Sequence, residues 1–117
     1  MAAPRPELWR INDRRTFQTL RQNGRRIRRG PLAVTWLAPS PGSTAPPRAG
    51  FALGRSVGGA VLRNRIRRRL RAALRELQAQ GRLPAGTYLL GGGPELAELP
   101  WSALVELLEA TLDEVSS

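Results

Sequence analysis

The fold of this chain is decided by one stretch, Gly58-Gly-Ala-Val-Leu-Arg-Asn-Arg-Ile-Arg-Arg-Arg-Leu-Arg71. Six of the nine residues from Arg63 to Arg71 are arginine. At about 100° per residue, the apolar residues of this stretch and of the segment after it share one side of a helix; they are Leu62, Ile66, Leu70, Ala73, Leu74 and Leu77. The pattern predicts a helix from about Gly59 to Gln80, with one face on a core and the other rich in arginine.

The arginine face has two interpretations. A run of charges on a helix is most often only a solvated face, but such a face normally mixes both signs. Here cations repel one another at the i,i+3 and i,i+4 spacings, and Glu76 is the only acidic residue close enough in sequence to offset them. Because this repulsion costs stability unless an external negative charge balances it, we interpret the face as a binding surface for a polyanion.

Composition narrows the function classes. The chain has 117 residues and a formal net charge of +10, and its 19 basic residues are all arginine. That length fits one domain with a single modest core. With neither cysteine nor histidine, disulfides, thiolate zinc sites and an imidazole general base are excluded. The strong positive charge favours a nucleic acid as the partner.

Charge and hydropathy also vary along the chain. Eighteen of the 19 arginines lie within residues 1–75, whereas six of the nine acidic residues lie from Glu95 onward. The apolar runs are too short to span a bilayer, and the N-terminal residues do not resemble a signal peptide. These features predict a cytoplasmic protein without a membrane segment.

Turn signals and periodicity predict the other elements. Residues 1–10 are expected to lack stable structure, and Asn12 or Asp13 is expected to cap a short helix that ends at Asn23-Gly24. Residues 25–29 fit either an edge strand or an irregular loop. Strands are predicted at 32–37, 49–53 and 86–90, with a flexible loop at 38–48 and a flexible turn at 91–93. Pro100 begins a last helix.

This order predicts a single α+β domain over residues 1–117, with a mixed sheet packed by helices. The basic helix forms the crossover between two strands. Since a crossover helix is held by the sheet beneath it, its arginines should form a rigid array.

The chain shows no equipment for catalysis of its own. Its acidic residues are scattered, and none forms a close pair suited to acid–base or two-metal chemistry. Glu95 and Glu98 have the spacing of metal ligands but no nitrogen ligand nearby. The glycine-rich segments 54–59 and 91–93 match neither a Walker loop nor a dinucleotide fingerprint.

The basic stretch also resembles a family signature. Residues 57–68 are similar to the signature of the bacterial ribonuclease P protein subunit, in which Gly-Asn-Ala-Val precedes an Arg-Asn-Arg box on a helix. Here Gly58-Gly59-Ala60-Val61 precedes Arg63-Asn64-Arg65. Phe17 with Gly24, and the run Gly50-Phe-Ala-Leu-Gly54, resemble the family's first helix and central strand. The resemblance covers roughly residues 12–112 and implies the order αβββαβα with a left-handed crossover.

The resemblance implies a function and a set of site residues. The protein would bind a large catalytic RNA, and a cleft between the first helix and the sheet would hold the 5′ leader of precursor tRNA. Chemistry would lie on the RNA subunit with Mg²⁺, and no cofactor or obligate protein partner is assigned to this chain. The implied RNA-subunit-binding residues are Arg55, Ser56, Arg63, Asn64, Arg65, Arg67, Arg68 and Arg71. The leader-binding candidates are Phe17, Trp36 and Phe51, each of which also fits a place in the core.

The chain departs from the family pattern at several positions that concern single-stranded RNA. Gly59 replaces the usual Asn, and Arg21 stands where a second aromatic is frequent. Thr35-Trp36 occupies a region that often carries Tyr or Phe, and Gly91-Gly92 replaces Ala-Arg.

Two other function classes share this size, charge and layout. One is a ribosomal or chaperone-like RNA-binding protein without an enzyme partner, which should prefer ribosomal RNA. The other is an architectural DNA-binding protein, which should prefer duplex DNA. Choice of partner separates the three.

Overall fold

A computed structural model describes residues 9–11 and 13–117 of the chain. In chain order the elements are β1 (Trp9–Arg10), α1 (Arg14–Asn23), β2 (Arg25–Arg29), β3 (Leu32–Leu37), β4 (Arg48–Ala52), α2 (Ala60–Ala79), β5 (Thr87–Gly92), the 3₁₀ helix η1 (Pro94–Ala97) and α3 (Trp101–Ser116). The predicted α+β class is confirmed. The helices and strands follow the predicted order, and the structure adds β1 and η1 to it.

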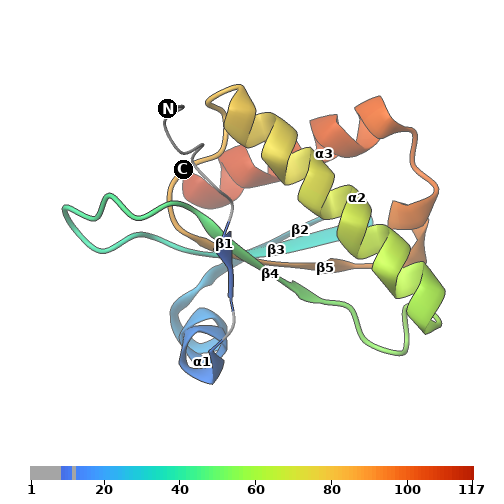
Figure 1. Ribbon diagram of the computed structural model, residues 1–117, viewed down its shortest axis with the longest axis horizontal. Coiled ribbons are helices and arrows are strands. Elements are labelled where there is room, and N and C mark those ends of the chain that lie inside the picture. The colour runs from blue at the N-terminus through green and yellow to red at the C-terminus, as the bar shows by residue number, and fades with distance from the viewer. Residues whose placement is uncertain (1–8, 12) are drawn as a thin grey trace, which may run out of the picture.

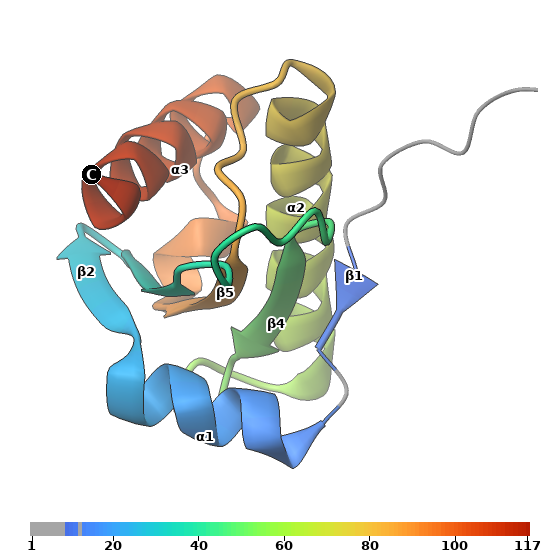
Figure 2. The same ribbon diagram turned by 90° about the vertical axis from the view of Figure 1, so that its left-hand side faces the viewer.

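The strands form one mixed sheet in the order β1-β4-β5-β3-β2. β1, β4 and β5 run parallel, and β3 runs antiparallel to both β5 and β2. Helix α2 is the crossover between the neighbouring parallel strands β4 and β5. Helices α2 and α3 cover one face of the sheet, and α1 lies at the other face (Figures 1 and 2).

The main core lies between the sheet and the helices α2 and α3. The predicted apolar stripe of α2 is confirmed, because all its members are buried except Leu62, which is half-buried against the core. Tyr88 of β5 is fully buried and donates a hydrogen bond to the carbonyl oxygen of Pro84. With this stripe in the core, the arginines of α2 turn to the outside.

Helix α1 begins and ends where the sequence predicts. Asp13 is the N-cap, and its Oδ2 accepts a hydrogen bond of 3.0 Å from the backbone N–H of Thr16. Asn12, the other candidate, lies outside the described residues. At the far end, the N–H of Gly24 donates to the carbonyl oxygen of Leu20 at 2.9 Å. A Cβ at Gly24 would lie 2.4 Å from that oxygen, so this close turn requires glycine.

Two local predictions need correction. Residues 9 and 10 form β1, which pairs with β4, although the sequence predicts no structure there. Gly91 and Gly92 are not a flexible turn: they extend β5 and pair with Ala33 and Leu32. In both cases backbone pairing within the sheet outweighs a weak local signal. Of the two alternatives for residues 25–29, the edge strand is confirmed, because β2 is the last strand of the sheet.

Gly92 shows why glycine stands at the end of β5. Its φ is +153°, and a Cβ there would lie 2.0 Å from the carbonyl oxygen of Pro31. Such contact with a backbone atom has no room to relax, so the approach of β5 to the β2–β3 turn requires glycine. Within the described part of the chain, no helix has the length and apolarity of a membrane span.

Candidate nucleic-acid interface

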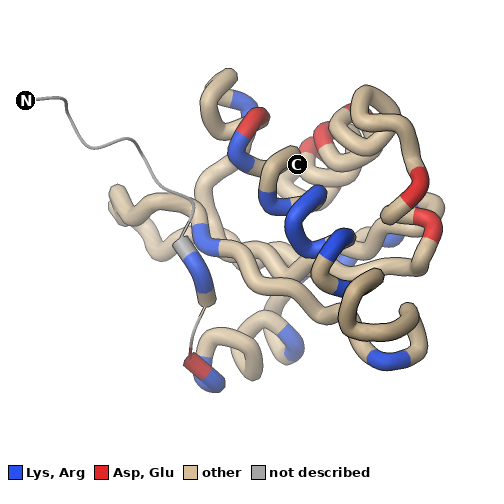
Figure 3. The backbone as a smooth tube through the Cα atoms, turned by 45° about the vertical axis from the view of Figure 1, so that its right-hand side comes forward, with Lys and Arg blue, Asp and Glu red and all other residues tan. Residues whose placement is uncertain are grey.

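Six of the eight predicted RNA-subunit-binding residues lie on α2, whose arginines are the blue segments of that helix in Figure 3. Arg65, Arg68 and Asn64 are exposed, and Arg63, Arg67 and Arg71 are half-buried. The Oδ1 of Asn64 accepts a hydrogen bond of 2.6 Å from the guanidinium of Arg67. Asn64 therefore orients one arginine of the row.

Arg69 lies in the same run but has a different environment. Its guanidinium donates hydrogen bonds to the carbonyl oxygens of Leu96, at 2.6 Å, and Leu99. These contacts tie α2 to η1 and to the segment between η1 and α3. Arg69 is thus a structural residue, in contrast to its neighbours on the helix.

A pocket opens at the sheet edge where β1 and β4 meet α1 and α2. We call it the edge pocket; its cavity volume is about 740 Å³, and it is lined by Arg10, Ile11, Phe17, Ala49, Gly50, Phe51, Asn64, Arg67, Arg68 and Arg71. It brings together two sets of residues that the sequence treats separately. Two of the three leader-binding candidates lie here beside four of the RNA-subunit-binding candidates.

The two phenyl rings of the edge pocket have different contacts. The guanidinium carbon of Arg71 lies 5.3 Å from the centre of the Phe51 ring, in a cation–π contact. The Phe17 ring packs against Gly50, with a carbon atom 3.0 Å from the place that a Cβ would occupy. Both rings are half-buried, so each keeps exposed surface.

Arg10 is a site residue that sequence reasoning missed. It is exposed and enters the edge pocket because β1 pairs in parallel with β4, with Arg10 opposite Ala49. No periodicity in the sequence marks this two-residue strand. Burial lowers the pKa of Arg71, and the charges of nearby arginines lower it further; these are Arg10, Arg75 and Arg67. Positive charge therefore accumulates around this pocket.

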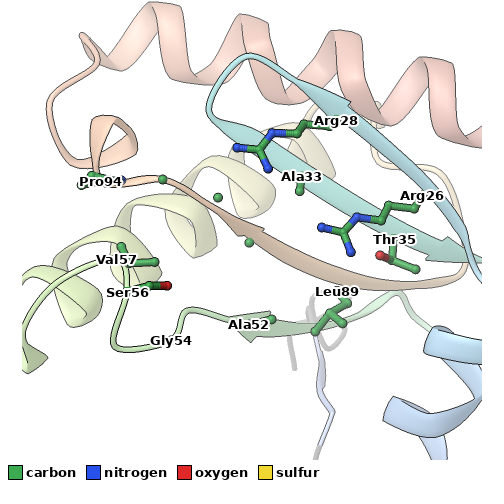
Figure 4. A pocket seen from close by; sticks show the side chains of 13 residues that line it. Arg26, Arg28, Ala33, Thr35, Ala52, Gly54, Ser56, Val57, Leu89 and Pro94 are labelled. Atoms are coloured by element: carbon green, nitrogen blue, oxygen red, sulfur yellow. The ribbon is translucent and has the colours of Figure 1, made fainter.

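A second hollow lies on the sheet face opposite α2 and α3. We call it the sheet hollow, and its cavity volume is about 350 Å³. Arg26 and Arg28 of β2 reach over it from one side, and Ser56 lies at the other side (Figure 4). Arg55, the neighbouring candidate, is exposed in the loop that leads into α2. The arginines of β2 were not assigned to a site from the sequence.

Trp36 does not join the other leader-binding candidates. It pairs with Tyr88 across β3 and β5 and packs against the main core. Its indole N–H donates to the carbonyl oxygen of Ala85 at 3.0 Å. Because side chains alternate along a strand, Thr35 faces the sheet hollow in place of Trp36. The structure thus places Phe17 and Phe51 in the lining of the edge pocket, on opposite faces of β4, and Trp36 outside it.

A family model described as Ribonuclease P matches residues 6–116. The chain belongs to the ribonuclease P protein family. Among its relatives, the ribonuclease P protein component of Thermobifida fusca is 39% identical over 99% of this chain and 80% of its own length. The ribonuclease P protein component of Acidothermus cellulolyticus is 38% identical over 80% of this chain and 81% of its own length. The family predicted from the Arg-Asn-Arg box is confirmed.

Solved structures of ribonuclease P proteins share the fold. The protein from Thermotoga maritima matches with a TM-score of 0.76 at 21% identity, over 92% of this chain and 98% of that one. A Staphylococcus aureus protein matches with a TM-score of 0.74 at 19% identity, over 92% of this chain and 95% of that one. The sheet and helices described above are therefore arranged as in this family.

Proposed function

We propose that this chain is the RNA-binding subunit of ribonuclease P, and that it assists a catalytic RNA in removing the 5′ leader from precursor tRNA. The observation that carries the proposal is the position of the edge pocket beside the arginine row of α2. Cations on a rigid helix bind phosphates of a folded RNA, and exposed rings stack on unpaired bases. One continuous surface can then contact a structured RNA and a single strand together.

In this proposal the catalytic RNA, with Mg²⁺, hydrolyses the phosphodiester. The protein contributes charge: its arginines neutralise phosphates and release counterions, which makes binding strongly dependent on salt. Less phosphate repulsion then remains between the RNA subunit and the precursor. Mg²⁺ has less charge to screen, so the complex should need a lower Mg²⁺ concentration. The cytoplasmic location stays a prediction.

Relative affinity tests the choice of partner. We expect tighter binding to ribonuclease P RNA than to a ribosomal RNA fragment or a DNA duplex of similar length at the same ionic strength. Arg65→Ala combined with Arg68→Ala should weaken that binding, because both side chains are exposed on α2. The control is Arg29→Ala combined with Arg82→Ala, which removes two charges already paired with Glu114 and Glu109. A preference for ribosomal RNA or duplex DNA would contradict the proposal.

A further inference from the structure

We propose that the indole of Trp101 is a stacking platform for an unpaired base of the RNA subunit, beside the arginine row of α2. The inference rests on the proposed function, since the base belongs to ribonuclease P RNA. It adds one aromatic contact to a helix surface whose other contacts are to phosphates, and it brings the first residue of α3 into the interface.

Trp101 is a large apolar side chain that the fold leaves uncovered. It keeps 41% of its surface exposed, and among the described residues the other exposed large hydrophobic side chain is Val61. Single exposed apolar side chains are common on protein surfaces, so exposure alone does not indicate a ligand. What distinguishes Trp101 is that its ring is held in place by the helix that carries the arginines.

Contacts with α2 fix the ring. The indole N–H donates a hydrogen bond of 3.1 Å to Oε2 of Glu76, so the side chain reaches from the start of α3 to α2. The segment before Trp101 is held as well, because Arg69 of α2 donates to the carbonyl oxygens of Leu96 and Leu99. Figures 1 and 2 show α2 and α3 side by side on one face of the sheet. A ring that is already oriented loses little conformational entropy when a base stacks on it.

The ring lies on a side of α2 that also carries exposed arginine. Arg65, Arg69 and Glu76 have the spacing i, i+4, i+11, which places them along one side of a helix. Arg65 is exposed, and so is its neighbour Arg68. Arg65 and Glu76 are separated by about 16 Å along the helix axis. A few nucleotides of one RNA strand can bridge that distance, so a strand with phosphates at these arginines can reach Trp101 with a base.

The charges around the ring favour a base over a phosphate. Glu76 is the only acidic residue of α2, and its carboxylate lies at the edge of the indole. Glu98, which is exposed, comes three residues before Trp101. These carboxylates repel a phosphate group, whereas the face of a neutral base stacks on an aromatic ring without bringing a charge to it. The phosphates therefore belong at the arginines and the base at Trp101.

The test measures equilibrium binding of ribonuclease P RNA to the whole chain at several salt concentrations. Trp101→Ala removes the ring, Trp101→Tyr keeps an aromatic ring, and Trp101→Leu keeps apolar surface without one. Arg65→Ala with Arg68→Ala is the comparison, since it removes two exposed cations from the same helix. Thermal unfolding checks that each variant is folded.

We expect Trp101→Ala to weaken binding about tenfold, a typical effect of losing one base–aromatic stack. Its slope of log affinity against log salt should equal that of the original protein, because no phosphate contact is lost. The arginine variant should lower that slope by about 1.8, the value for two phosphate contacts on a duplex. Trp101→Tyr should recover most of the affinity, and Trp101→Leu should bind as weakly as Trp101→Ala. Full affinity for Trp101→Leu would show that the side chain acts only by apolar packing and would overturn the inference, as would unchanged affinity for Trp101→Ala.

Fluorescence gives a second readout that does not depend on a destabilised variant. The chain has three tryptophans, so the emission of Trp101 is the difference between the original protein and Trp101→Phe. Saturating ribonuclease P RNA should quench this difference signal, because a base stacked on an indole quenches its emission. A difference signal that the RNA leaves unchanged would contradict stacking. If the original protein showed no preference for ribonuclease P RNA, the proposed function itself would fail, which is a separate result.

Discussion

Arg69 lies inside the arginine run of α2, but its guanidinium binds the carbonyl oxygens of Leu96 and Leu99. Arg69→Ala should lower the free energy of unfolding by about 2 kcal/mol, because hydrogen bonds from a charged group are lost and two carbonyl groups lose their partner. Urea denaturation measures this loss. Arg75→Ala, an exposed site on the same helix, is the control and should change stability by less than about 0.5 kcal/mol. Equal effects would mean that Arg69 has no special structural role.

Asp13 gives a prediction that depends on pH. Hydrogen bonds from the side chain and backbone of Thr16, and to a lesser degree the charge of Arg48, lower the pKa of Asp13 below its usual value of 3.8. A lowered native pKa means that the carboxylate stabilises the fold above pH 3.8, and that this contribution is lost as pH falls through the native pKa. Asp13→Ala should therefore reduce the melting temperature at neutral pH, and its difference from the original protein should shrink in acid. A difference that is constant with pH would contradict this role.

At the scale of elements, β1 brings Arg10 to the edge pocket. Arg10→Ala should weaken binding of a short single-stranded RNA several-fold and lower the salt slope by about 0.7, the value for one phosphate contact. Arg14→Ala is the matched control, because Arg14 is an exposed arginine of α1 that lines neither the edge pocket nor the sheet hollow. Fluorescence anisotropy with a labelled oligonucleotide measures both. An equal loss of affinity for Arg14→Ala would show that Arg10 acts only through the net charge of the protein.

Some of these elements can be predicted from the sequence and others cannot. Helix α2 and its buried face follow from the spacing of Ile66, Leu70 and Leu74, since helical periodicity is a local property. β1 does not, because two residues carry no period and pair only once β4 exists. Gly91 and Gly92 have the composition of a turn, but pairing with β3 holds them in a strand.

The candidate site was predictable to a similar extent. The arginines of α2 are found from the Arg-Asn-Arg box, and the sequence offers Phe17, Phe51 and Trp36 as leader-binding candidates. Only the register of β3 against β5 shows that Trp36 turns to the core and Thr35 to the hollow. Likewise, only the strand at residues 25–29 shows that Arg26 and Arg28 line the sheet hollow, whereas Arg25 and Arg29 bind the C-terminal end of the chain.

At the scale of the whole molecule, charge is separated in space as well as along the chain. Arginines gather on α2 and line both the edge pocket and the sheet hollow. The carboxylates lie chiefly on α3 and just before it, as the red segments of Figure 3 show. Two of the carboxylates on α3 are paired, Glu114 with Arg29 and Glu109 with Arg82. The field of the protein should therefore orient an approaching RNA toward α2 and away from α3.

The most direct test of the account is cleavage of precursor tRNA by ribonuclease P RNA across a Mg²⁺ titration, with and without this protein. We predict correct 5′ cleavage at low Mg²⁺ only when the protein is present. Arg63→Ala combined with Arg65→Ala should shift the titration back toward the curve of the RNA alone. Coincident curves with and without the protein, despite tight binding of the same RNA, would contradict a role in ribonuclease P and leave a general RNA-binding module as the better description.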